Sequence, residues 1–167
     1  MRFFVLFLLG ALLVSSCREA STPPEKSDRI IRSDSGDPIL DEIALEARET
    51  ISDFIRHLRN PHKGEERFRI KYPFRADSGS GIDKEYLWLS DITFMNGSYF
   101  ANVANRPYYT SGIELGSEVT FFMDDIADWM YIRNGKIVGG RSIKYLIDKI
   151  PPLDRDEEME RLLGLFE

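Results

Sequence analysis

The sequence contains few of the residues that most often carry catalytic or metal chemistry. Its 167 residues include one cysteine, Cys17, and two histidines, His57 and His62. A single cysteine excludes a disulfide framework, so we expect the apolar core alone to stabilise the folded part. Neither histidine lies in a zinc-type spacing, and no serine lies in a nucleophile-elbow motif, which argues against a catalytic triad and a metal site. The sequence also indicates no cofactor.

Acidic residues outnumber basic ones, and long apolar runs are few. The chain has 22 lysines and arginines against 28 aspartates and glutamates, a formal net charge of −6. Because nucleic acids are polyanions, we expect no nucleic-acid partner. The one continuous apolar run, residues 3–14, is shorter than the roughly 20 residues that span a bilayer as a helix. No oligomeric state follows from the sequence.

The N-terminus has the organisation of a secretion signal. Arg2 precedes the apolar run, which ends in Val14-Ser15-Ser16-Cys17, an aliphatic and two small residues before the cysteine. This resembles the lipobox of bacterial lipoproteins, in which the signal peptide, here residues 1–16, is removed and the cysteine is acylated. Cys17 is therefore the predicted lipid attachment site, and its acyl chains anchor the protein by about 0.8 kcal/mol per buried CH₂. The alternatives are an ordinary cleaved signal with a chance cysteine and an uncleaved anchor.

The residues after the cysteine predict a location and a tether. Arg18, and not aspartate, follows Cys17, and the sorting rule of bacterial lipoproteins then favours the outer membrane, facing the periplasm, in a two-membrane bacterium. Residues 17–36 are polar and contain two prolines, which is typical of a flexible tether. We expect residues 37–167 to form a single domain in the bacterial cell envelope.

Helices are predicted at both ends of this domain. Asp37 can cap the first helix, and Asn60-Pro61 ends it, with apolar residues at three- and four-residue spacing between them. Ser142 can cap a helix that ends before Pro151-Pro152, and an acidic helix follows near the C-terminus.

Strands fill the segment between these helices. Residues 67–74 alternate between apolar and basic side chains, which is the period of a half-buried strand. Asn-Gly pairs at 96–97 and 134–135 predict hairpins. The fold class is therefore α+β, with an N-terminal helix packed on a mainly antiparallel sheet of about five or six strands, followed by C-terminal helices. Most strand aromatics are expected in the core; they are Phe68, Tyr72, Phe74, Trp88, Phe94, Phe100, Phe121 and Trp129.

One short segment concentrates polar groups that have no obvious structural role. Asp124, Asp125, Asp128 and Arg141 are the candidate binding residues. The aspartates have the chemistry of cation ligands or of an acid/base pair, but their spacing does not match a calcium loop. The structural alternative is that Asp124 or Asp125 caps a following turn while the neighbouring apolar residues face the core.

The ordered blocks of the domain resemble a known family. These blocks are "RFRIKYPF", "EYLWLSDITFMNGSYFANVANRP" and "LGSEVTFFMDDIADWMYIRNGKIVGGRSIKYLI". They are similar to the YegJ-like family, a bacterial domain of unknown function numbered 2314, over residues 65–150. Its strongest marks here are Trp88-Leu89, Asn105 with Pro107, Gly116 with Val119, Ile126 with Asp128 and Trp129, and Gly139-Gly140. The resemblance implies no catalytic residues, and related domains joined to ankyrin-type repeats favour an interaction module.

Three hypotheses follow from these patterns. The first is a non-catalytic binding or protein-interaction module, held to the membrane by its acyl chains and paired with a protein of the envelope. The second is a hydrolase or metal-assisted enzyme that uses Asp124, Asp125 or Asp128. The third is an envelope-stress or toxin-neutralising lipoprotein, which also requires a protein partner.

Overall fold

Six strands form one antiparallel sheet in the computed structural model, which describes residues 36–167. The strand order is β4-β3-β2-β1-β5-β6. The strands are β1 (Glu65–Arg75), β2 (Lys84–Met95), β3 (Ser98–Val103), β4 (Glu118–Phe121), β5 (Asp128–Arg133) and β6 (Lys136–Gly139). The predicted α+β class is confirmed. The predicted signal peptide, Cys17 and all but the last residue of the predicted tether lie outside the described residues.

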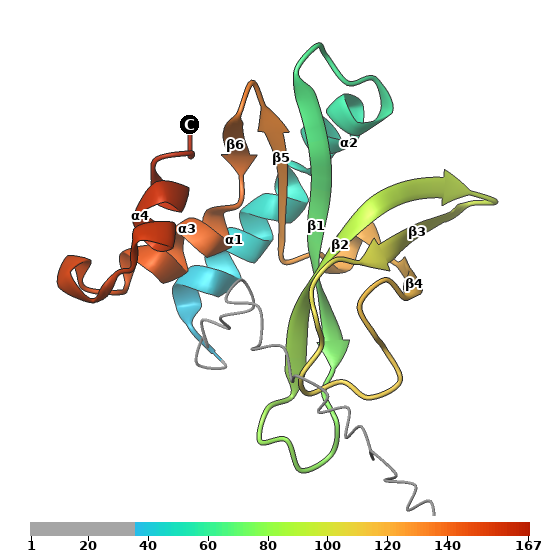
Figure 1. The fold of residues 1–167 in the computed structure, drawn as a ribbon. Coiled ribbons are helices and arrows are strands. Elements are labelled where there is room, and N and C mark those ends of the chain that lie inside the picture. Colours follow the sequence, from blue (N-terminus) through green and yellow to red (C-terminus); the bar gives the residue numbers. More distant parts are fainter. Residues whose placement is uncertain (1–35) are drawn as a thin grey trace, which may run out of the picture.

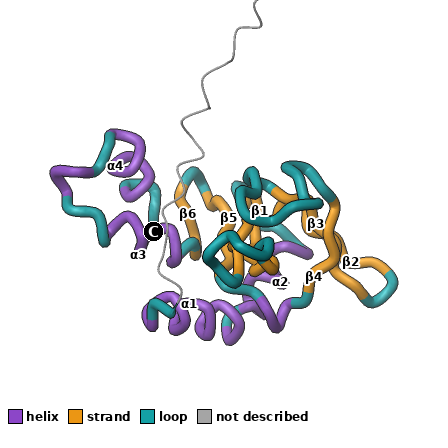
Figure 2. The backbone as a smooth tube through the Cα atoms, turned by 90° about the horizontal axis from the view of Figure 1, so that it is seen from below, coloured by secondary structure: helices purple, strands orange, loops and turns teal. Residues whose placement is uncertain are grey.

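Helices lie on one face of the sheet and beyond one of its edges. Helices α1 (Pro38–Glu49) and α2 (Ile51–Arg59) run along one face, and α3 (Arg141–Asp148) and α4 (Glu157–Leu163) lie at the β6 end (Figures 1 and 2). Two short 3₁₀ turns, η2 (Met123–Asp125) and η3 (Pro152–Asp154), complete the elements. Within residues 36–167, no helix combines the length and the apolar character that a bilayer span requires.

The first helix is interrupted where the sequence predicts one continuous helix. The break lies at Thr50, whose hydroxyl donates to the Glu46 carbonyl at 2.7 Å. Such a bond back to the preceding turn competes with the helical ladder and bends helices. The Thr50 hydroxyl also accepts a hydrogen bond from the Trp129 indole N–H at 3.1 Å, which joins the bend to β5. The bend thus lets α1 and α2 follow the twisted sheet as two segments.

The core lies between these helices and the sheet. Phe54 of α2 is fully buried, and it meets Phe68 edge to face, with ring centroids 5.8 Å apart, and Trp129 at 5.6 Å. A phenylalanine buried in this way contributes about 1.5–3 kcal/mol relative to an exposed one. The aliphatic and aromatic residues of the sheet that close the core are Ile70, Leu87, Leu89, Ala101, Val103, Phe121 and Tyr131.

Both predicted hairpins are present. Met95 pairs with Ser98 across Asn96-Gly97, and Arg133 pairs with Lys136 across the second Asn-Gly pair. Each turn asparagine has a positive φ, as the favoured two-residue turns require. A bulge then bends β2 before its hairpin: Asp91 has φ 53°, and the register with β3 shifts between Ser90 and Thr93.

Three of the strand aromatics expected in the core lie outside it: Trp88 and Phe100 are half-buried and do not join the core cluster, and Phe94 is exposed. Phe94, expected in the core, is 53% exposed near the end of β2. The reason is length: β2 has 12 residues and α2 has nine. At about 3.4 Å per strand residue and 1.5 Å per helix residue, α2 covers only part of the strand. The outer end of the β2–β3 hairpin therefore extends past the helix that packs on it.

Candidate functional site

Asp128 is the most enclosed of the candidate residues. It is the first residue of β5, it is 2% exposed, and both of its carboxylate oxygens accept backbone hydrogen bonds. Oδ1 accepts from the Trp129 N–H at 2.8 Å, and Oδ2 accepts from the Ser142 N–H at 2.8 Å. Ser142 lies in the first turn of α3, where backbone N–H groups lack helical partners. Asp128 therefore caps α3 from a neighbouring strand.

This geometry corrects the predicted start of the helix. Ser142 is not its N-cap; that position belongs to Gly140, which has φ 66° and makes no side-chain cap bond. Glycine adopts this left-handed conformation without strain. A Cβ on Gly140 would also lie 3.2 Å from the Phe166 ring and 3.3 Å from Ile137. The chain thus turns sharply from β6 into α3, and Asp128 supplies the acceptor that a capping side chain would otherwise provide.

Lys71 completes a polar network around this carboxylate. Lys71 pairs with Asp128 across β1 and β5, and its Nζ donates to the Ser142 hydroxyl at 3.2 Å. Burial lowers the pKa of Lys71, although the charge of Asp128 opposes this. Burial also raises the pKa of Asp128, although Ser142, the charge of Lys71 and the Trp129 N–H oppose it. Ser142 is only 2% exposed, so a substrate cannot reach its hydroxyl without rearrangement of α3.

The other candidate residues point to different places. Asp124 and Asp125 are exposed in η2 and do not cap a following turn, so the capping role proposed for them is wrong. The other part of the structural alternative holds, because the neighbouring Ile126 is fully buried in the core. Tyr72 donates to Asp125 at 3.4 Å, whereas the Asp124 side chain has no partner within the described residues. Arg141 forms an ion pair with Glu46 of α1. Residues 36–167 contain no group of three or more acidic, histidine or cysteine side chains arranged for a metal ion.

The two histidines meet at a second buried carboxylate. Glu65, at the start of β1, has a side chain that is 1% exposed. Its Oε2 lies 2.9 Å from His57 Nδ1 and accepts from the His62 N–H at 2.9 Å. Burial would raise the pKa of Glu65, but these hydrogen bonds and the charges of both histidines lower it below its ordinary value. This cluster ties the end of α2 to the sheet.

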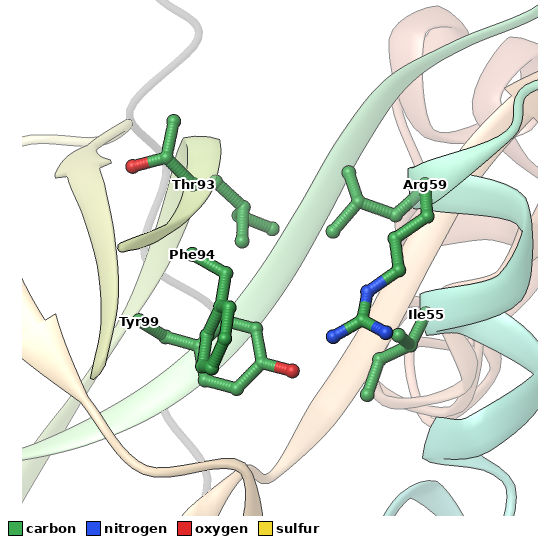
Figure 3. Close-up of a pocket in the computed structure, with 7 residues that line it drawn as sticks. Ile55, Arg59, Thr93, Phe94 and Tyr99 are labelled. Atoms are coloured by element: carbon green, nitrogen blue, oxygen red, sulfur yellow. The ribbon is translucent and has the colours of Figure 1, made fainter. Parts of the chain in front are cut away.

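An apolar groove lies where no candidate residue was predicted. It has a volume of about 350 Å³ and lies between the end of α2 and the β2–β3 hairpin (Figure 3). Its lining residues are Ile55, Leu58, Arg59, Ile92, Thr93, Phe94 and Tyr99. The Arg59 guanidinium lies 5.7 Å from the centre of the Phe94 ring. No signal in the sequence alone indicates the groove, because it depends on where α2 ends against β2.

Together these features define the class of the protein. It is an α+β domain with a six-stranded antiparallel sheet, internally satisfied buried carboxylates and an open groove beside one hairpin. The chain belongs to the family of uncharacterised proteins conserved in bacteria (DUF2314), which matches residues 37–166. The resemblance seen in the sequence is thereby confirmed.

Two relatives illustrate the family. The chain is 32% identical over 125 residues to "Uncharacterized protein YegJ" of Escherichia coli (strain K12), covering 70% of this chain and 79% of that protein. It is 35% identical over 89 residues to a "Putative ankyrin repeat protein" of Neisseria meningitidis serogroup B, covering 53% of this chain and 35% of that protein. The chain therefore spans about a third of the second relative. No solved structure matches the chain.

Proposed function

We propose that the chain is a lipid-anchored protein of the bacterial cell envelope whose domain binds a protein partner without catalysing a reaction. The observation that carries the binding role is the groove at the end of α2, which leaves an aromatic ring and a guanidinium exposed side by side. A concave site of about 350 Å³ with several apolar side chains in its walls falls within the size range of binding sites. The relative with an ankyrin-repeat name agrees with a domain used for interactions.

The disposition of the aspartates favours binding over hydrolysis. Asp128 is occupied by two backbone N–H groups, and Asp124 and Asp125 are exposed outside the groove. An acid/base pair has to converge on one substrate position, and these three carboxylates do not. If Asp124→Asn or Asp125→Asn abolished the protein's cellular role while leaving partner binding intact, the enzymatic alternative would replace our proposal.

The anchor is tested by changing the cysteine. In Cys17→Ala cells, we expect the precursor to stay unprocessed or the protein to lose its acyl chains, because the thiol that accepts the lipid is gone. Mass spectrometry and membrane fractionation measure both effects. Ser16→Ala, which keeps a small residue before the cysteine, is the matched control. An unchanged mass and unchanged fractionation in Cys17→Ala would contradict the anchor.

The binding role is tested by crosslinking in intact cells. A photoreactive benzoylphenylalanine at position 94 places the crosslinker at the groove, and the same residue at position 86 places it at another exposed aromatic site, since Tyr86 is 43% exposed. We expect a discrete protein adduct from position 94 and none from position 86. No adduct from position 94, or the same adducts from both, would contradict a partner at the groove.

A further inference from the structure

The walls of the groove suit one large apolar side chain. Ile55 and Leu58 form the helix side, and Ile92, Phe94 and Tyr99 form the hairpin side. A volume of about 350 Å³ is near the lower end of the roughly 300–1,000 Å³ typical of ligand sites. An open groove of this size accommodates an aromatic or aliphatic side chain with its backbone, whereas a long acyl chain requires a more enclosed tunnel.

The rim of the groove carries a cation without an acidic partner. Within residues 36–167, Arg59 makes a ring contact with Phe94 but no ion pair. Its neighbour Arg56, one turn earlier on α2, is paired with Asp53 at 2.9 Å. In Figure 3 the Arg59 guanidinium points from α2 toward Phe94 and Tyr99 on the hairpin. A guanidinium in this position matches the charge and geometry of an incoming carboxylate.

The helix dipole accounts for only part of this arrangement. Arg59 is the last residue of α2, where a positive charge is favourable. The dipole does not account for Phe94, which faces the guanidinium and is 53% exposed. An aromatic ring and an unpaired cation on opposite walls together select a ligand that is apolar at one point and anionic at the next.

We propose that the groove receives an aromatic or aliphatic side chain of a partner polypeptide, and that a carboxylate next to that side chain pairs with Arg59. This inference rests on the proposed binding function and specifies the chemistry of the partner. The apolar and the acidic residue are adjacent in the partner segment, and the segment turns at that point so that both reach the groove, because successive side chains of an extended strand point to opposite faces.

The test uses matched peptides on the full chain held on lipid nanodiscs. The probes are acetyl-Gly-Phe-Glu-Gly-amide and acetyl-Gly-Phe-Gln-Gly-amide, which differ only in the charge. Methyl NMR follows Ile55, Leu58 and Ile92, with Leu146 of α3 as the remote control. We expect the three groove methyl groups to shift and the Glu peptide to bind about threefold more tightly, which is the scale of an exposed ion pair. Added salt should reduce this preference.

Two pairs of variants test separately the role of Arg59 in the preference for the Glu peptide and the role of Phe94 in binding both peptides. Arg59→Ala should abolish the preference for the Glu peptide, whereas Arg56→Ala should retain it. Phe94→Ala should weaken both peptides, whereas Tyr86→Ala should weaken neither. Phe94 and Tyr86 are 53% and 43% exposed, so neither truncation empties the core.

The possible failures are distinguishable. Equal affinities of the two peptides, or shifts outside the groove, would overturn the assigned chemistry while leaving the crosslink at position 94 to support a partner. Sodium octanoate that shifts the groove methyl groups at lower concentration than the Glu peptide would also overturn it, in favour of a lipid-derived ligand. Loss of the crosslink in cells would instead count against the proposed function.

Discussion

Asp128 and Glu65 are both strand carboxylates removed from water, and each ties a helix end to the sheet. Asp128 accepts from Ser142 in the first turn of α3, and Glu65 accepts from His62 just beyond α2. Folding nevertheless moves their pKa values in opposite directions, upward for Asp128 and downward for Glu65. Burial raises the pKa of both, but Asp128 as a whole residue is the more deeply buried, at 2% exposed against 9% for Glu65, and the partners of the two carboxylates also differ.

The partners differ in how closely positive charge approaches the carboxylate. At Glu65, the His57 ring contacts the carboxylate at 2.9 Å. At Asp128, Lys71 makes no direct hydrogen bond to the carboxylate, because its Nζ donates to the Ser142 hydroxyl instead. Direct charge-assisted hydrogen bonds are the stronger ones. The comparison shows that a buried carboxylate favours its ionised form only when such contacts outweigh the loss of hydration.

The largest effect is expected from removing the Asp128 carboxylate. Asp128→Ala leaves the Ser142 and Trp129 N–H groups without their acceptor and Lys71 without its counter-charge. We expect the free energy of unfolding to fall by about 3 kcal/mol, measured by urea denaturation. Asp128→Asn, which keeps one acceptor oxygen, should lose less. A loss below about 0.5 kcal/mol in Asp128→Ala, the usual scale of surface substitutions, would show that the carboxylate does not hold α3.

Measuring the free energy of unfolding across a pH series should distinguish the two carboxylates, because their ionisation changes stability in opposite directions. The pKa of Glu65 is below its ordinary value of 4.5, so its stabilisation is present above that pH and is lost as the pH falls through the folded pKa. The pKa of Asp128 is above its ordinary value of 3.8, so its contribution is largest below 3.8 and is lost as the pH rises through the folded pKa.

Replacing each carboxylate by its amide tests this difference in pH dependence. Glu65→Gln should lower stability at neutral pH, by less than Asp128→Ala, and should reduce the loss of stability between pH 5 and pH 3, about the range of ordinary carboxyl titration. Asp128→Asn should make that acid loss steeper. Urea midpoints across the range provide the data. Two variants that alter the slope in the same direction would invalidate the comparison.

A substitution at Lys71 tests whether its charge lowers the pKa of Asp128. Lys71→Met removes a charge whose burial is unfavourable, but it leaves the buried Asp128 carboxylate without its counter-charge. Stability should therefore fall, by less than in Asp128→Ala, which also leaves two backbone N–H groups without an acceptor. The pKa of Asp128 should rise further, because the charge of Lys71 holds it down. Carboxyl ¹³C NMR titration measures this value, and Glu65 serves as the internal reference. An unchanged Asp128 titration would mean that Lys71 does not act on it.

Local patterns predicted most of the fold. The Asn-Gly turns, the alternation in β1 and the apolar spacing of the first helix depend on neighbours in sequence, and each predicts its element. The break at Thr50 could not be predicted in this way, because the Trp129 indole that reinforces it lies 79 residues away. The cap of α3 was missed for the same reason: Ser142 was predicted as the cap, but the acceptor is the carboxylate of Asp128, 14 residues earlier in the sequence.

The candidate site was harder to predict than the fold. Asp128 and Arg141 were selected as unexplained polar groups, and the structure explains both through internal partners. The groove depends on where α2 ends beneath a bulged strand, which is a property of two elements packed together. Phe94 shows the difficulty: its place in a strand predicts burial, but the end of α2 leaves it exposed.

The smallest effect is expected at Asp124, which lies four residues before Asp128 in the same segment. Asp124 is exposed and has no side-chain partner within the part of the chain described, so Asp124→Ala should change the free energy of unfolding by less than about 0.5 kcal/mol. Asp125→Ala should lose only the 3.4 Å hydrogen bond from Tyr72 and change stability little more. Urea denaturation beside Asp128→Ala makes the measurement. A loss at Asp124 comparable to that at Asp128 would mean that this carboxylate has an internal role as well, and the contrast between buried and exposed members of the segment would no longer hold.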